Sequence, residues 1–292
     1  MLIRQPAVAG RFYPDGPEDL RQEVRHFLDA GAQALPAPRH TTPVALMLPH
    51  AGHVFCGHVI GATLAGMRLP RTLILLCPNH TGMGRPLSVW PDGAWLTPLG
   101  PVTVDASLAA GLCEGPTVFE ADTHAHLREH ALEVILPFLQ VHQPEPFRIV
   151  PICVGTRQRD VLHQAGRDLA RLLAGRLLPK PSGESGGDML QVALVVSSDM
   201  NHYEDQHRTL QKDDMALRHA LAGDADGLLH ITQREGISMC GAAPLALALY
   251  ALRQLTGKTP PLAEQTLHDT SGSISGDMEH VVGYAGLRFF LP

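Results

Sequence analysis

Three histidines follow directly on short apolar runs, and imidazole is the side chain that most often binds a metal or moves a proton near neutral pH. They are His50 after residues 44–48, His80 after residues 72–77, and His202 shortly after residues 192–196. Short apolar runs that end in proline or polar residues are typical of buried strands. The carboxyl ends of parallel strands meet at one edge of a sheet, where α/β proteins place their ligand sites. We therefore expect these histidines to converge on one pocket.

A cysteine and an aspartate extend this candidate site. Neutral imidazole and thiolate are common transition-metal ligands, and Cys240 precedes a predicted helix whose amino end favours the thiolate. His50, His80 and Cys240 therefore make a candidate three-ligand site with coordination positions left open. Asp199 lies three residues before His202, so it can set the tautomer and the pKa of a general acid or base.

Each of these residues also has a purely structural interpretation. Isolated cysteines are most often small buried residues that ease packing, and Cys240 could be one. Asp199 could cap the helix that follows it, and most of the seventeen histidines are expected to be solvated or satisfied in the core. The candidate ligands are scattered along the chain and form no compact metal motif, so both interpretations stay open.

A second polar cluster lies within residues 120–133. On a helix, Glu129 and Glu133 would share one face with His126 and His130 beside them, because residues four apart are neighbours. Such a face either lines a pocket or forms a solvated stripe with internal ion pairs. The sequence favours the solvated stripe.

The remaining pattern predicts the elements that position these side chains. Strands are expected over residues 44–48, 72–77, 87–90, 102–104, 148–154, 192–197 and 281–291, and helices over 17–30, 57–67, 106–113, 157–175, 206–222, 224–235 and 245–255. Alternation of strand and helix implies parallel neighbouring strands. We predict a single α/β domain over residues 1–292, a layered sandwich around a mixed, largely parallel sheet. Residues 179–188, rich in Gly, Ser and Pro, are predicted to form a surface loop.

Composition limits the functions open to the chain. With 45% hydrophobic residues, 18% charged residues and a net charge of −6, it is typical of globular proteins and has no basic run for nucleic acid. No apolar run is long enough to cross a membrane, and the first residues lack a signal-peptide core. We expect a cytoplasmic protein with neither nucleic-acid nor membrane partners. The five cysteines form no CxxC motif and are expected to be free thiols.

Six landmarks resemble, in order along the chain, those of the Memo family, whose bacterial and archaeal members are labelled protein B of the AmmeMemoRadiSam system. They lie at residues 6–14, 49–53, 78–80, 129–133, 197–203 and 240–241. The resemblance implies a fold like that of class III extradiol ring-cleaving dioxygenases, with the site at one end of the central sheet. It places metal ligands on His50, His80 and Cys240, and further pocket residues on Asp199 and His202.

Four more residues of these landmarks are expected to bind substrate or to line the pocket rim. Family members often carry a bulky aromatic residue where this chain has His53, so we expect an added polar group there. The other three are Asn79, Glu129 and His130.

The implied cofactor is one transition-metal ion. The dioxygenases hold ferrous iron with two histidines and a carboxylate, whereas this pattern has a thiolate in place of the carboxylate. A softer ligand moves the preference toward copper or zinc and changes the redox behaviour of iron. Iron or copper is therefore expected first, with zinc as an alternative.

Three functions fit these residues. The leading hypothesis is a mononuclear metal protein with redox or oxygen-dependent, dioxygenase-like activity on a small substrate, in which His202, held by Asp199, moves a proton. The second is a non-catalytic protein that binds a peptide or partner in the same pocket, because vertebrate relatives are associated with receptor signalling and fold does not fix function. The third is a metal-dependent hydrolase. The resemblance also implies a radical SAM protein of the same system as a partner.

Overall fold

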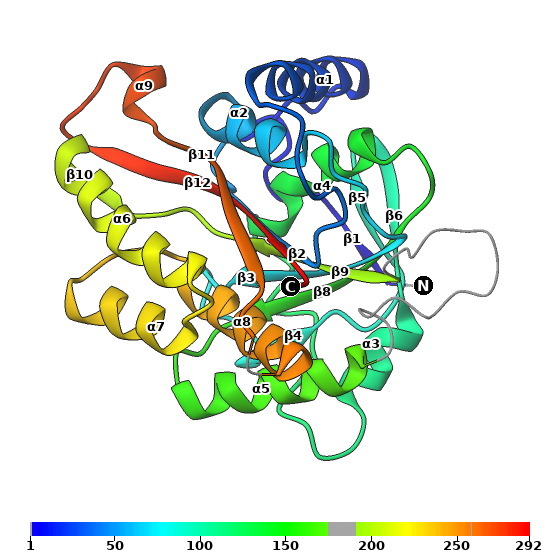
Figure 1. Cartoon of the computed structure of the whole chain (residues 1–292). Coiled ribbons are helices and arrows are strands. Elements are labelled where there is room, and N and C mark those ends of the chain that lie inside the picture. Colours follow the sequence, from blue (N-terminus) through cyan, green and yellow to red (C-terminus); the bar gives the residue numbers. More distant parts are fainter. Residues whose placement is uncertain (1, 175–190, 258) are drawn as a thin grey trace.

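One mixed sheet runs through the protein, in a computed structural model that describes residues 2–174, 191–257 and 259–292 (Figure 1). Its central strands are parallel and lie in the order β6 (Gly100–Val104), β8 (Arg148–Val154), β3 (Thr72–Pro78), β9 (Val192–Ser197) and β2 (Ala45–Leu48). Beyond β2 lie two antiparallel strands, β12 (Val281–Phe290) and β11 (Leu262–Thr270). The predicted layered α/β architecture with a mixed, largely parallel sheet is confirmed.

Short strands extend the sheet at its margins. They are β4 (Leu87–Val89) and β7 (Glu120–Ala121) beside the end of β8, β5 (Ala94–Thr97) and β1 (Ile3–Arg4) beyond β6, and β10 (His202–Glu204) on β12. β8 therefore pairs with β6 at its start and with β4 at its end. The side of β8 that faces away from β3 is therefore divided between these two strands.

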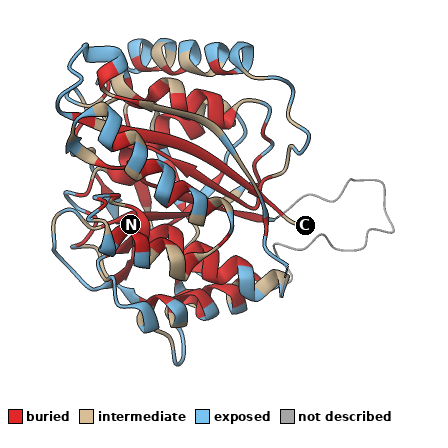
Figure 2. Ribbon diagram, turned by 60° about the vertical axis from the view of Figure 1, so that its left-hand side comes forward, coloured by how far each residue is buried: buried red, intermediate tan, exposed pale blue. Residues whose placement is uncertain are grey.

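Helices cover both faces of the sheet. One face carries α1 (Pro17–Ala34), α2 (His53–Leu64) and α4 (Ala131–His142). The other carries α3 (Ala106–Cys113), α5 (Arg159–Leu173), α6 (Gln206–Leu221), α7 (Ala225–Arg234) and α8 (Ala242–Thr256), and the short α9 (Gly272–Ser275) follows β11. Figure 2 shows the buried sheet between the two helical layers, whose outer faces are exposed. Each layer contributes its own apolar cluster, because strands buried on both sides have apolar residues on both faces.

Several helix boundaries differ from the prediction, most of all those of α2 and α1. α2 begins at His53 rather than residue 57 and ends at Leu64, shortly before Gly66 takes a φ of 71° that favours glycine. α1 continues to Ala34, into the predicted loop. By contrast, α3 begins where predicted, because the Asp105 side chain accepts a hydrogen bond from the Leu108 amide at 3.0 Å.

Other predictions concern what lies outside the central sheet. β11 was not predicted, because its alternating and partly exposed residues carry no continuous apolar run. The predicted surface loop at residues 179–188 lies outside the described residues. All five cysteines are free thiols, as expected. Within the described parts of the chain, no helix is long and apolar enough to cross a membrane.

Candidate metal centre

Three neighbouring parallel strands deliver the predicted site residues to one edge of the sheet. His80, Asp199 and His50 each lie two residues beyond the last residue of β3, β9 and β2, respectively. Cys240 joins them from the turn that precedes α8. One ring nitrogen of each of His50 and His80 and the Cys240 sulfur lie within 4.8 Å of one another. The structure therefore brings together the three residues predicted as metal ligands.

The hydrogen bonds around His50 determine which of its ring nitrogens is free. The Ser197 hydroxyl donates to the Ala131 carbonyl at 2.7 Å, so its oxygen accepts the proton of His50 Nδ1, also at 2.7 Å. The lone pair of His50 then lies on Nε2, which is 3.4 Å from the Cys240 sulfur. Such a fixed tautomer is typical of metal-binding histidines.

Glu129 fixes the tautomer of His80, as Ser197 fixes that of His50. Its carboxylate accepts hydrogen bonds from the His80 backbone amide at 2.6 Å and from His80 Nδ1 at 2.9 Å. His80 therefore also presents Nε2 to the pocket. Burial raises the pKa of Glu129, but the bonds from His80 and Ala131 outweigh it and hold the pKa at about 2. The carboxylate is thus ionised and orients His80, so it supports the pocket rim from behind.

Burial sets the charge of two candidate ligands. It lowers the pKa of His50 well below its usual range, and the neighbouring His80 and His130 lower it further. A neutral imidazole is the form that binds a metal. Burial and the Asp199 carboxylate raise the pKa of the Cys240 thiol. Burial therefore opposes the thiolate that the amino end of α8 was expected to favour. A coordinated cation would deprotonate such a thiol.

The candidate ligands open into a pocket of about 590 Å³. It is lined by Phe12, His50, Ala51, Gly52, His80, His130, Asp199, His202, Tyr203, Ser238, Cys240, Val282 and Tyr284. The sequence analysis missed Phe12, Tyr203, Ser238 and Tyr284 as lining residues. Phe12 and Tyr203 lie inside the landmarks at 6–14 and 197–203 and could have been found there, whereas nothing in the sequence marks Ser238.

His202 and Asp199 both line the pocket, but they do not form the predicted pair. The Asp199 carboxylate accepts a hydrogen bond from the His50 backbone amide at 2.7 Å. Neither ring nitrogen of His202 has a hydrogen-bond partner among the described residues, and Nδ1 is buried. The interpretation that Asp199 holds His202 through a hydrogen bond is therefore wrong. The His202 ring is instead available to a ligand in the pocket.

The cluster at residues 126–133 is buried, so the predicted solvated stripe is wrong. α4 begins only at Ala131, and the side chains of His126, Glu129 and Glu133 are at most 1% exposed. His130 lines the pocket, with its ring 4.9 Å from that of His80 and 5.5 Å from that of His50 between centroids. The cluster therefore combines pocket and support residues.

A buried ion pair supports this cluster from behind. Arg4 donates to the backbone carbonyls of His126 and Glu129 and forms an ion pair with Glu133 at 2.6 Å. Glu133 also accepts from the amides of Ala7 and Val8 and from a tyrosine hydroxyl, that of Tyr13. These bonds attach the N-terminal segment to the start of α4, and thereby place Phe12 at the pocket.

Glu129 was predicted at the rim but lies behind the pocket lining, and two more residues predicted at the rim lie elsewhere. His53 is buried in the first turn of α2, where its ring nitrogens bond to Glu23 at 2.8 Å and to the Val134 carbonyl at 2.9 Å. Asn79 closes the turn after β3, because its side chain bonds to Thr81, Gly82 and Met83. Neither side chain lines the pocket. Both shape the backbone on either side of it.

The donor set fits a transition-metal ion. Two Nε2 atoms and one sulfur converge, both imidazole tautomers are fixed by partners outside the ligand set, and His80 is partly exposed to solvent. Three ligands with further open positions suit copper, iron or zinc better than magnesium or calcium, which prefer oxygen.

Comparisons with known proteins agree over nearly the whole chain. A family model described as "Memo-like protein" matches residues 4–288. A "MEMO1 family protein" of Desulfurococcus amylolyticus is 37% identical over 299 residues and covers 100% of both chains, and one of Sulfolobus acidocaldarius is 36% identical over 298 residues and covers 99% of each. The crystal structure of the uncharacterized protein JW3007 from Escherichia coli K12 matches with a TM-score of 0.52. The match covers 84% of this chain and 98% of the Escherichia coli chain at 13% identity. At this identity the match shows a similar fold alone.

Proposed function

Since this chain belongs to the Memo family, and since two oriented imidazoles and a thiol converge in its pocket, we propose that it is a mononuclear transition-metal protein with redox or oxygen-dependent activity on a small substrate. The observation that carries the proposal is the pair of fixed tautomers. Ser197 and Glu129 each accept a hydrogen bond from Nδ1 of one histidine, which leaves both Nε2 atoms free, and one ring nitrogen of each histidine lies within 4.8 Å of the Cys240 sulfur. A histidine with a purely structural role does not need a free, oriented Nε2 atom beside a second imidazole and a thiol.

The ion would be held by His50, His80 and Cys240, and when bound it would supply Lewis acidity and, for iron or copper, redox chemistry. The thiol in place of a carboxylate moves the preference toward copper or zinc. Iron or copper is proposed first because the oxygen-dependent activity needs a metal that changes its oxidation state, and zinc is the alternative. The dioxygenase-like activity and the identity of the metal are part of this proposal.

The chain's own residues would bind and orient the substrate. Phe12 and Tyr284 provide apolar walls, and His130 presents a ring beside the two ligand histidines. The His202 ring has no hydrogen-bond partner among the described residues, so it can exchange a proton with a group on the substrate. Burial raises the pKa of Asp199, so this carboxyl can also hold a proton next to His50.

A binding protein without turnover is the second candidate, and Tyr203 favours it. Tyr203 lines the pocket yet is 75% exposed, and its φ of 62° is a left-handed conformation that a bulky residue rarely adopts. An aromatic ring held in solvent at a pocket mouth suits a peptide or partner protein. The radical SAM partner expected from the resemblance remains a prediction, as does the cytoplasmic location.

Elemental analysis of protein purified without oxygen tests the metal site. We expect about one equivalent of iron or copper per chain, and its loss in His50→Ala and Cys240→Ser. Matched controls are Cys113→Ser, a thiol outside the pocket, and His124→Ala, an exposed histidine with a 70% exposed side chain. Both controls are expected to keep the metal.

Two outcomes would decide against parts of the proposal. Full metal occupancy in both ligand variants would exclude these residues as the site. Stable zinc, with no oxygen consumption on a panel of catechols, would instead favour the hydrolase or the binding protein over the oxygen-dependent activity.

A further inference from the structure

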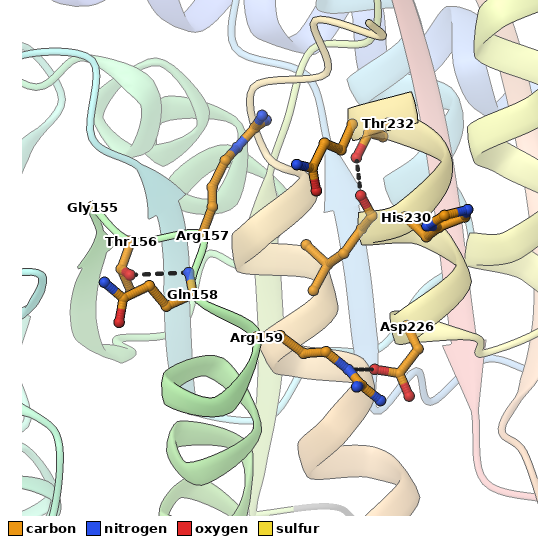
Figure 3. A pocket seen from close by; sticks show the side chains of 10 residues that line it. Gly155, Thr156, Arg157, Gln158, Arg159, Asp226, His230 and Thr232 are labelled. Atoms are coloured by element: carbon orange, nitrogen blue, oxygen red, sulfur yellow. Dashed lines mark hydrogen bonds and ion pairs between the residues drawn. The ribbon is translucent and has the colours of Figure 1, made fainter. Parts of the chain in front are cut away.

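A second cavity lies at the same edge of the sheet, beyond the end of β8. It has a volume of about 880 Å³ and is formed by residues 155–159, between β8 and α5, on one side and by α7 on the other. Figure 3 shows residues 155–158 facing α7, with the ion pair between Arg159 and Asp226 at one end. Its polar lining includes Arg157, Gln158, Arg159, Asp226 and Gln233.

Hydrogen-bond donors dominate this lining. Arg157 uses one nitrogen to donate to the Met239 carbonyl at 3.1 Å, and within the described chain its guanidinium makes no other hydrogen bond, although it has five N–H donors. The side-chain amides of Gln158 and Gln233 have no hydrogen-bond partner among the described residues either. The His230 ring points away from residues 155–158, so it adds no donor on the side where they lie (Figure 3).

The carboxylate of the cavity, in contrast, is already engaged. Asp226 is the one carboxylate among the described lining residues, and it accepts from Arg159 Nε at 2.6 Å and from the Tyr250 hydroxyl. Two arginines and one paired aspartate leave the cavity with a net positive charge, in a protein whose net charge is −6. A guanidinium with free N–H groups matches the oxygens of a phosphate or carboxylate.

One short loop separates this cavity from the candidate metal centre. The loop at residues 238–240, named here the cysteine loop, puts Ser238 and Cys240 into the lining of the metal pocket. Its middle residue, Met239, is buried and gives its carbonyl to Arg157 on the other side. The guanidinium that faces the second cavity therefore braces the loop that carries the candidate sulfur ligand.

We propose that the second cavity binds a small molecule through a phosphate or carboxylate group, and that this ligand strengthens the hold of Arg157 on the cysteine loop. An anion that contacts the free N–H groups orders an otherwise exposed side chain in the conformation that bonds to Met239. The evidence for the binding site comes from the second cavity and does not depend on the proposed metal function. The effect on Cys240 rests on the proposed metal function, and it makes anion binding and metal retention mutually reinforcing.

Titration calorimetry with inorganic phosphate and with citrate, on the protein as purified and at constant ionic strength, tests the site and separates phosphate from carboxylate ligands. We expect binding to the wild type and to Arg253→Gln, a matched loss of an exposed arginine on α8 that has no hydrogen-bond or ion-pair partner among the described residues. Arg157→Gln is expected to lose binding. Gln233→Glu, which leaves Arg157 and its bond to Met239 in place, is expected to weaken binding at least about ten-fold by repulsion.

Equal binding of both anions to the wild type, Arg157→Gln and Gln233→Glu would overturn the site, and so would the absence of binding to the wild type. The second measurement is the rate of metal transfer to a chromogenic chelator, which we expect the bound anion to slow roughly five-fold or more in the wild type and not in Arg157→Gln. An unchanged rate in the presence of binding would overturn the coupling. A protein without metal would overturn the proposed function and the coupling, while calorimetry would still decide the anion site.

Discussion

The pocket has two walls that are supported in different ways. The histidine wall, made of His80, Glu129 and His130, is held by buried charges, because Glu129 accepts from His80 and Arg4 donates to the Glu129 carbonyl. The cysteine loop is held by neutral hydrogen bonds to residues 198–202 and by the exposed Arg157. A buried charge without its partner is costly, whereas an exposed side chain can be rearranged at little cost.

This difference assigns different tasks to the two walls. A wall fixed by buried charges keeps its ligand geometry when conditions change, so His80 is preorganised. A loop braced from the surface can respond to what binds there. The candidate sulfur ligand, rather than either histidine, lies on the loop that Arg157 contacts from the second cavity.

The largest expected effect comes from breaking the support of the histidine wall. Glu133→Ala leaves Arg4 buried without its partner and removes the acceptor of two backbone amides, and both side chains of the pair are fully buried. The free energy of unfolding, measured by urea denaturation, should fall by about 3–5 kcal/mol.

The matched variant on the other wall is Arg157→Gln, which removes one hydrogen bond from an exposed side chain. Its free energy of unfolding should fall by less than about 1 kcal/mol. Equal losses in Glu133→Ala and Arg157→Gln would contradict the distinction between the two walls.

An acid-dependent loss of stability is expected from His126, behind the histidine wall. Burial lowers the pKa of His126 from 6.5 to about 4, Arg4 also lowers it, and the bond to the Ser88 carbonyl opposes the shift. The unfolded chain therefore takes up this proton first as the pH falls. The contribution of His126 to stability is complete above pH 6.5, falls between pH 6.5 and about 4, and is lost below, by about 3 kcal/mol in all.

The measurement is the free energy of unfolding of the wild type against His126→Gln between pH 7.5 and 4. The difference between the two proteins should shrink as the pH falls, because the variant cannot titrate at this position. His124→Gln, at an exposed histidine two residues away, serves as the control and should follow the wild type. A constant difference across this range would show that His126 is not held neutral by the fold.

The last prediction concerns the orientation of one ligand. Glu129→Gln keeps the shape of the side chain but removes the charge that accepts from His80 Nδ1. Loss of such a partner behind a ligand weakens metal binding about 10- to 100-fold, which chelator competition measures. Glu120→Gln, at an exposed position, is the control. If both variants bind the metal as the wild type does, Glu129 does not orient His80 for metal binding.

Local sequence patterns were enough to predict the central sheet. Apolar runs that end at proline or polar residues located β2, β3, β8 and β9 nearly to the residue, because a fully buried parallel strand needs apolar residues on both faces. The resulting parallel order brought His50 and His80 to one edge, as predicted. The edge strand β11 was missed because a partly solvated strand lacks such a run.

Support residues were harder to predict, since their role depends on partners far away in the chain. Glu133 resembles a surface acid of an amphipathic helix, and its burial is made favourable by Arg4, 129 residues earlier, together with the amides of Ala7 and Val8 and the Tyr13 hydroxyl. His53 looked like a rim residue, but the early start of α2 turns it toward Glu23. Nothing local in Ser197 indicates that it orients His50.

The amino-acid sequence by itself determined the layered α/β fold and the delivery of two histidines to one edge of the sheet, because burial and strand order follow from short-range apolar patterns. Only the tertiary structure decided that the Cys240 sulfur meets them, which tautomer each histidine has, and that Arg157 faces a second cavity. Those properties depend on distances of a few ångströms between residues that are 49 to 190 positions apart, and no local pattern encodes such distances.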